Sequence, residues 1–256
     1  MARLIDVYNA IDSFAPFASQ ADYDKSGIKL GENDLDVTGI LVTLDTTMPV
    51  VMEARELGCN VIIEHHPSIW TPLESIDTTI PVNQSLVHAI KFDIAIISAH
   101  TNVDFAKGGL GDRVSELMGL TNIYAIEPSC ARIGELEKAV ALDEYAKTLK
   151  AVFNDKYVHT VGDPNKKIKK VALINGGGGA DADPVLDSYK QGCDVFVTSD
   201  VKHHVARLAK DLNYAIIELS HHATEYPFVA LMAAKMKEKL SDVRIFATTV
   251  LENPYN

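Results

Sequence analysis

The sequence predicts an α/β fold of mixed, mostly parallel sheets flanked by helices, built from two internally duplicated halves. Short apolar runs alternate with helix-like stretches, which is typical of strands joined by helical crossovers. The stretch from Gly58 to Ile63 (GCNVII) also resembles the stretch from Gly192 to Val197 (GCDVFV), 134 residues later. Such self-similarity indicates related structural units. We therefore expect a first half at residues 1–125 and a second at 126–256, forming one compact molecule.

The first half begins with a helix, because residues 4, 7, 8 and 11 are apolar and the pattern ends near Pro16. Residues 24–31 are punctuated by glycine and predict a loop. A strand, a helix stopped by Gly58 and a second strand then form a βαβ unit, and a further helix and strand follow. The expected ranges are, in order, 39–44, 49–57, 61–63, 82–91 and 94–98.

The second half follows a connecting stretch that carries short helices at 112–117 and 142–153. It repeats the alternation of the first half with apolar strands near 171–174, 195–197 and 215–217. Helices are expected between and after these strands. Their ranges are 184–190, 201–208 and 224–240.

Composition bounds the class of protein. The 256 residues are 47% hydrophobic and 23% charged, as in globular proteins, and no apolar run approaches the roughly 18 residues of a membrane span. No signal peptide is evident, so we expect a cytoplasmic protein that does not insert in membranes. The net charge of −11 opposes attraction to nucleic acid, although a local basic patch stays open. The three cysteines form no CxxC pair and are expected to be packed thiols.

Histidine is concentrated in a way that indicates metal chemistry. Seven of the nine histidines fall in four short clusters, and each cluster follows an apolar run. In α/β proteins, ligands bind beyond the carboxyl ends of the strands, which is where these clusters lie. Imidazole and carboxylate together suit zinc, iron or manganese. The clusters are Glu64 to Pro67, His100 to Asp104, Asp200 to His204 and His221 to Glu225.

In the first half, His65 and His66 are expected metal ligands, because Pro67 ends the strand and both rings can turn to one side. Asp104 is the expected carboxylate ligand. His100 has three open roles: ligand, partner of a ligand, or proton carrier. Glu64 can orient a histidine or simply face outward.

In the second half, His221 and Glu225 are the expected ligands, since their spacing matches that of His100 and Asp104. Asp200 has two open readings, as the N-cap of the following helix or as a functional residue. One of His203 and His204 is expected to face the cavity and hold a substrate phosphate or carboxylate. The four glycines at 176–179 indicate a tight turn, or alternatively N–H groups donated to an anion.

Taken together, several motifs resemble those of the Nif-three-like family, also known as GTP cyclohydrolase I type 2 homologues. The resemblance covers nearly the whole chain. It implies a duplicated α/β fold around a dinuclear metal site, without an inserted middle domain, in a toroidal homohexamer. The ligands it implies are His65, His66, Asp104, His221 and Glu225. The motifs that carry it are Asp24-x-x-Gly27-x-x-x-Gly31, His65-His66-Pro67, His100-Thr-Asn-x-Asp104, Asn175 to Gly179, Ser199-Asp200-x-x-His203-His204 and His221-x-Ala-Thr-Glu225.

We expect a metal-dependent hydrolase in which two divalent ions (zinc, iron or manganese) share a water. Metal binding can lower the pKa of water to about 7. The substrate class is a small anion such as a nucleotide or phosphoester. His100, Asp200, His203 and His204 are the expected catalytic residues, which move protons or hold that anion. The alternative is a non-catalytic ring that binds metal as a scaffold or, less in keeping with the acidic charge, nucleic acid.

Overall fold

The computed structural model describes residues 1–126 and 129–255, and it shows a mixed α/β fold with two mixed sheets flanked by helices. The chain divides into two compact units. Unit 1 comprises Met1–Gly109 and Phe228–Glu252, and unit 2 comprises Leu110–Pro227 and the residues after Glu252. A boundary at residue 125 would separate two neighbouring strands of one sheet, and it would assign the last helix to the second half. The compact units therefore differ from the expected halves at 1–125 and 126–256.

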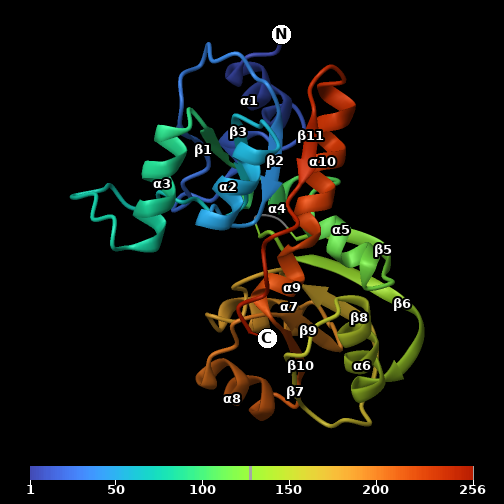
Figure 1. Cartoon of the computed structure of the whole chain (residues 1–256). Helices are drawn as coiled ribbons and strands as arrows, with labels where there is room; N and C mark the ends of the chain where they lie inside the picture. Colours follow the sequence, from blue (N-terminus) through green and yellow to red (C-terminus); the bar gives the residue numbers. More distant parts are fainter. Residues whose placement is uncertain (127–128, 256) are drawn as a thin grey trace. The chain divides into compact units, whose positions relative to one another are not determined.

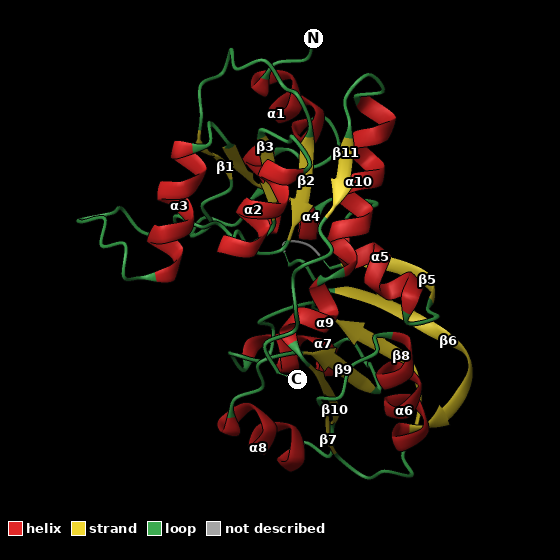
Figure 2. Cartoon of the chain, in the orientation of Figure 1, coloured by secondary structure: helices red, strands yellow, loops and turns green. Residues whose placement is uncertain are grey.

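Unit 1 contains a five-stranded sheet of order β1-β4-β3-β2-β11. Figure 1 and Figure 2 label β1, β3, β2 and β11 of this sheet. Four of its strands are parallel, and β1 is antiparallel to β4. Its elements are α1 (Leu4–Asp12), η1 (Phe17–Ser19), β1 (Gly27–Leu30), β2 (Ile40–Thr43), α2 (Met48–Glu56), β3 (Val61–Glu64), α3 (Pro81–Lys91), β4 (Ala95–Ser98), α4 (Thr101–Phe105), α10 (Pro227–Lys239) and β11 (Ile245–Ala247).

Two predictions for unit 1 were wrong in detail. The expected loop at 24–31 contains β1, because glycine at each end of the strand adopts a positive φ and the residues between them pair with β4. The single helix expected at 224–240 is two helices, α9 (His221–Glu225) and α10. Pro227 has no N–H to continue the hydrogen-bond ladder, so α9 ends before it.

The core of unit 1 forms where α2 and α3 cover one face of the sheet. Ile62 and Ile96 lie on neighbouring strands, are fully buried and pack with Val51 of α2 and Leu86 of α3. The alternate strand residues, such as Ile63, are also fully buried, so both faces of the sheet are covered. Strands buried on both faces are nearly continuous apolar runs, which explains why the sequence predicted β2, β3 and β4 well.

Unit 2 contains a six-stranded sheet of order β5-β6-β8-β9-β10-β7. Among its strand pairings, only β8 with β9 and β9 with β10 are parallel. The expectation of mostly parallel pairing therefore does not hold for this sheet. Its elements are α5 (Leu110–Leu117), β5 (Thr121–Ala125), β6 (Arg132–Ala141), α6 (Leu142–Val152), β7 (Val158–Val161), β8 (Lys167–Leu173), α7 (Asp183–Lys190), β9 (Val195–Thr198), α8 (His203–Asp211), β10 (Ala215–Leu219) and α9 (His221–Glu225).

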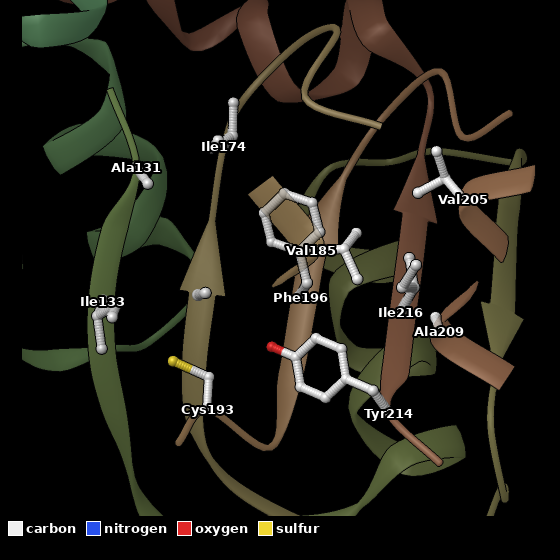
Figure 3. Packing of buried hydrophobic residues seen from close by; sticks show 11 residues of the cluster. Ala131, Ile133, Ile174, Val185, Cys193, Phe196, Val205, Ala209, Tyr214 and Ile216 are labelled. Atoms are coloured by element: carbon white, nitrogen blue, oxygen red, sulfur yellow. The ribbon is translucent and has the colours of Figure 1, made fainter. Parts of the chain in front are cut away.

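The antiparallel strands of unit 2 lie in the stretch that we expected only to connect the halves. Strand β5 is largely exposed, and β6 is exposed in its middle, where its register with β8 shifts. Neither strand has the continuous apolar run of a buried strand. The core lies instead around β9, where Phe196 packs with Val185 and Tyr214 (Figure 3). The buried Tyr214 hydroxyl donates to Ser188 Oγ at 3.0 Å, which satisfies its polar end.

Within the described part of the chain, no helix is both long and apolar enough to cross a membrane. Cys59 and Cys193 are buried at the starts of β3 and β9, as expected for packed thiols, whereas Cys130 is partly exposed. Burial raises the pKa of the Cys59 and Cys193 thiols to about 11 each. The charges of neighbouring side chains have a smaller effect on each pKa than burial has.

We predict that an alkylating reagent labels Cys130 first in the native protein. At about pH 8, roughly one in a thousand molecules of a thiol with a pKa near 11 is the reactive thiolate, and burial shields it further. Cys59 and Cys193 should react only after denaturation. Peptide mass spectrometry of a labelling time course tests this, and equal labelling of all three cysteines in the native state would contradict it.

Candidate metal centre

Three histidines of unit 1 converge at the carboxyl ends of β3 and β4. These strands are parallel, with Glu64 paired to Ser98, so the residues that follow them meet at one edge of the sheet. The ring centroid of His65 lies 5.1 Å from that of His66 and 5.0 Å from that of His100. One ligand atom from each of the three rings lies within 4.8 Å of the others. A single ion can therefore be reached by more than one imidazole.

Each of these histidines is oriented through its Nδ1 atom. His65 Nδ1 lies 3.0 Å from the carbonyl oxygen of Ala99, His66 Nδ1 lies 2.9 Å from Asp45 Oδ1, and His100 Nδ1 lies 2.9 Å from Asp24 Oδ1. An oxygen at Nδ1 fixes the tautomer and ring orientation so that Nε2 acts as the ligand atom, the arrangement typical of metal-binding histidines. The donor set and its orientation therefore fit a transition metal.

Asp24 is a buried carboxylate that connects β1 to the histidine cluster. Besides His100 it accepts hydrogen bonds from the backbone N–H and the hydroxyl of Thr101 and from Ser26 Oγ. Burial alone would raise the pKa of Asp24. The hydrogen bonds and the charge of His100 outweigh that effect and hold the pKa well below its usual value. Asp24 is therefore an anion that can stabilise a proton on His100.

Asp104 lies in α4, the short helix that begins after His100. Its side chain is buried, and Oδ1 lies 3.9 Å from His65 Nε2. That separation is longer than a hydrogen bond. It is close to the distance of about 3–4 Å between two ligand atoms that bind the same ion at 2.0–2.2 Å. The geometry of His65 and Asp104 is therefore compatible with shared coordination.

Glu64 neither faces outward nor orients a histidine. It is fully buried and accepts hydrogen bonds from Ser98 Oγ at 2.6 Å, from the Ser68 N–H at 2.8 Å and from the Thr46 hydroxyl. Burial raises the pKa of Glu64, and these hydrogen bonds oppose the rise. Glu64 thus connects the ends of β2 and β4 to the turn that follows His65 and His66.

In unit 2, His221 lies between two carboxylates. Its Nδ1 atom is 2.6 Å from Asp200 Oδ2, and its Nε2 atom is 2.9 Å from Glu225 Oε2. Strands β9 and β10 are parallel neighbours, so Asp200 after one strand reaches His221 after the other. Ser220 begins α9, and its hydroxyl accepts a hydrogen bond from the N–H of Ala223. The buried Glu225 and the partly exposed His221 are thereby held on one short helix.

Asp200 does not cap α8. Lys202 is the N-cap of that helix, and Asp200 adopts a left-handed φ of 56° that turns the chain toward His221. Asp200 therefore contacts His221 instead of capping the helix, and its catalytic role stays a prediction. His203 and His204 are exposed in the first turn of α8, and the structure does not bury them beside His221.

The glycines at 176–179 form a tight turn against α9 and the end of β9. The N–H groups of three of them donate hydrogen bonds within the protein. Gly176 donates to Thr224 Oγ1, Gly178 donates to the Gly176 carbonyl oxygen, and Gly179 donates to the Ser199 carbonyl oxygen. A Cβ on Gly176 would lie 2.0 Å from Glu225 Oε1. Close approach of the backbone to Glu225 therefore explains Gly176, and these three N–H groups are not directed at an anion.

The comparisons with known proteins agree with these motifs. The model of the family described as Duf34/NIF3 (NGG1p interacting factor 3) matches residues 2–254. The chain belongs to this family. It is 31% identical to a Clostridium perfringens protein named GTP cyclohydrolase 1 type 2 homolog, over 99% of the chain and 98% of the relative.

Solved structures of two similar proteins share the fold. The Staphylococcus aureus hypothetical protein SA1388 is 27% identical with a TM-score of 0.91, over 99% of this chain and 98% of that one. A Bacillus cereus protein related to NIF3 is 24% identical with a TM-score of 0.93, over 100% and 99% of the two chains. The fold of this Duf34/NIF3 chain is therefore the fold of its relatives.

Sequence reasoning missed two functional side chains in this Duf34/NIF3 protein. The sequence motifs did not include Asp45, and its Oδ1 atom lies 2.9 Å from His66 Nδ1. Asp24 was recognised as part of a motif but not as the partner of His100, which lies 76 residues away. Asp45 follows the buried strand β2, and an acidic residue in that position is the signal that could have found it.

We predict that Gly176→Ala destabilises unit 2 more than Gly192→Ala does. Both glycines have similar left-handed φ values, 66° and 70°, so each alanine should cost about 1–2 kcal/mol of backbone strain. A Cβ on Gly192 meets nothing within 4 Å. Gly176→Ala should add about 1–3 kcal/mol through its clash with Glu225. Urea unfolding of both variants measures the difference, and equal losses would contradict the contact.

Proposed function

We propose that this Duf34/NIF3 protein binds two divalent transition-metal ions and hydrolyses a small anionic substrate of the nucleotide or phosphoester class. The observation that supports it most is the cluster of His65, His66 and His100, whose ligand atoms lie within 4.8 Å. An oxygen orients each of the three rings. Such ordered imidazoles are costly to arrange without a ligand.

The proposed ligands are His65, His66 and Asp104 from unit 1 and His221 and Glu225 from unit 2. Two parallels support a duplicated origin for them. In each unit, histidine or acidic residues follow two parallel strands. In each, the second strand leads into a five-residue helix, α4 or α9, that carries the proposed carboxylate ligand. Imidazole and carboxylate suit zinc, iron or manganese, and the choice among these stays open.

When bound, two such ions supply Lewis acidity and a water of lowered pKa at neutral pH. The residues around them have separate tasks. His100, paired with the anionic Asp24, can accept a proton at Nε2 and hold it as an imidazolium. Asp200 orients His221 through Nδ1. His203 or His204, exposed at the start of α8, is proposed to bind the anionic part of the substrate. A homohexameric ring and a cytoplasmic location stay predictions.

We predict that the protein replenished with metal binds two ions per chain and that His65→Ala loses at least one of them. His65 is fully buried and its ring is fixed by Ala99, so its removal takes an ordered donor atom out of the cluster. His88→Ala is the matched control, because His88 is partly exposed on α3 and its Nδ1 atom lies 2.8 Å from the Gln84 carbonyl oxygen of the same helix. Elemental analysis reads the stoichiometry. Unchanged metal content in His65→Ala would contradict the assignment.

We further predict turnover of nucleotides or phosphoesters by the metal-loaded protein, and a loss of about 100-fold or more in Glu225→Gln, as expected for a ligand substitution. Gln keeps the shape of the buried side chain. Glu238→Gln, on the exposed surface of α10, should leave the rate unchanged. A screen of both variants beside the wild type measures this. Equal inactivity of all three, with metal retained in the wild type, would favour a metal-binding scaffold.

A further inference from the structure

An exposed aromatic pair lies beside the histidine cluster of unit 1. Trp70, the only tryptophan in the chain, is 42% exposed, and Tyr23 is 66% exposed. Their ring centroids are 6.4 Å apart. The Trp70 ring lies 5.7 Å from the His100 ring at an interplanar angle of 83°, so it stands edge-on beside the imidazole and does not cover it. Large aromatic surface left in water next to a polar site indicates a binding role.

The loops that carry the two rings are fixed to the histidine cluster. On one side of Tyr23, the Ala21 N–H donates to Thr101 Oγ1, and on the other side Asp24 accepts from the Thr101 N–H and from His100. The loop of Trp70 is held two residues earlier, where the Ser68 N–H donates to the buried Glu64. The aromatic pair is therefore ordered relative to His100 before any ligand arrives.

We propose that Trp70 and Tyr23, beside the histidine cluster of unit 1, form a stacking site for a planar, unsaturated ring of the anionic substrate. The proposal deepens the proposed function and rests on it for the anionic class of the substrate. Base–aromatic stacking tolerates different bases because every base has a π face, and a saturated phosphoester offers no π face for such a stack. The aromatic pair therefore selects ring-bearing phosphates over simple phosphoesters.

Trp70 fluorescence tests the proposal without requiring turnover, because no other tryptophan contributes. The full-length protein, both metal-free and metal-replenished, is titrated with adenosine monophosphate, phenyl phosphate and ribose 5-phosphate. The two ring compounds should change the emission with saturation, and ribose 5-phosphate should not. The same change with all three compounds, or none with any of them, would overturn the stacking site.

Variants measured by calorimetry locate the contact. Trp70→Leu and Tyr23→Leu should each weaken binding of adenosine monophosphate about fivefold or more, the scale of one base–aromatic stack. Trp70→Phe should retain most of the affinity, and binding of ribose 5-phosphate should not change. Tyr124→Leu, at an exposed tyrosine on β5 of unit 2, is the control. Unchanged binding in both leucine variants would contradict the proposal.

Elemental analysis of the same samples separates this proposal from the proposed function. A protein that binds two ions but shows no ring-dependent emission change lacks the stacking site and keeps its metal centre. A protein that takes up no metal but still distinguishes adenosine monophosphate from ribose 5-phosphate keeps the stacking site and contradicts the metal-dependent function.

Discussion

The alignment of parallel strand ends is the constraint on which both clusters depend. In unit 1 the pairing of Glu64 with Ser98 brings the residues after β3 and β4 to one edge of the sheet, and in unit 2 the pairing of β9 with β10 does the same for Asp200 and His221. Pairing fixes the backbone, and hydrogen bonds to Nδ1 then fix the rings. Apolar strands buried on both faces provide the rigidity that this positioning requires.

Buried carboxyl groups give the histidine cluster of unit 1 its order. Asp24 joins β1 to His100 and Thr101, and Glu64 joins three strand ends to the loop after the histidines. A buried polar group is costly unless hydrogen bonds satisfy it, so the carboxyl groups of Asp24 and Glu64 stabilise one arrangement of the loops around them. The same carboxyl groups hold the exposed Trp70 and Tyr23 beside the histidines. Order in the histidine cluster and order in the aromatic pair have a common source.

The sequence predicted the parts of the structure that local patterns determine. Continuous apolar runs located β2, β3, β4, β9 and β10, and the residues after them identified the histidine clusters. The strands β5, β6 and β7 were not predicted, because exposed residues interrupt their apolar pattern. The hydrogen-bond partners of His66 and His100 were not predicted, for a different reason. Asp45 and Asp24 are 21 and 76 residues distant in sequence, so only the folded sheet brings them to the rings.

Anomalous diffraction from crystals of the metal-replenished protein tests the central claim most directly. The account predicts two anomalous peaks per chain, each at about 2.0–2.2 Å from imidazole nitrogen or carboxylate oxygen atoms of His65, His66, Asp104, His221 and Glu225. Peaks bound only by other side chains, or no peak in protein that was fully replenished, would contradict it.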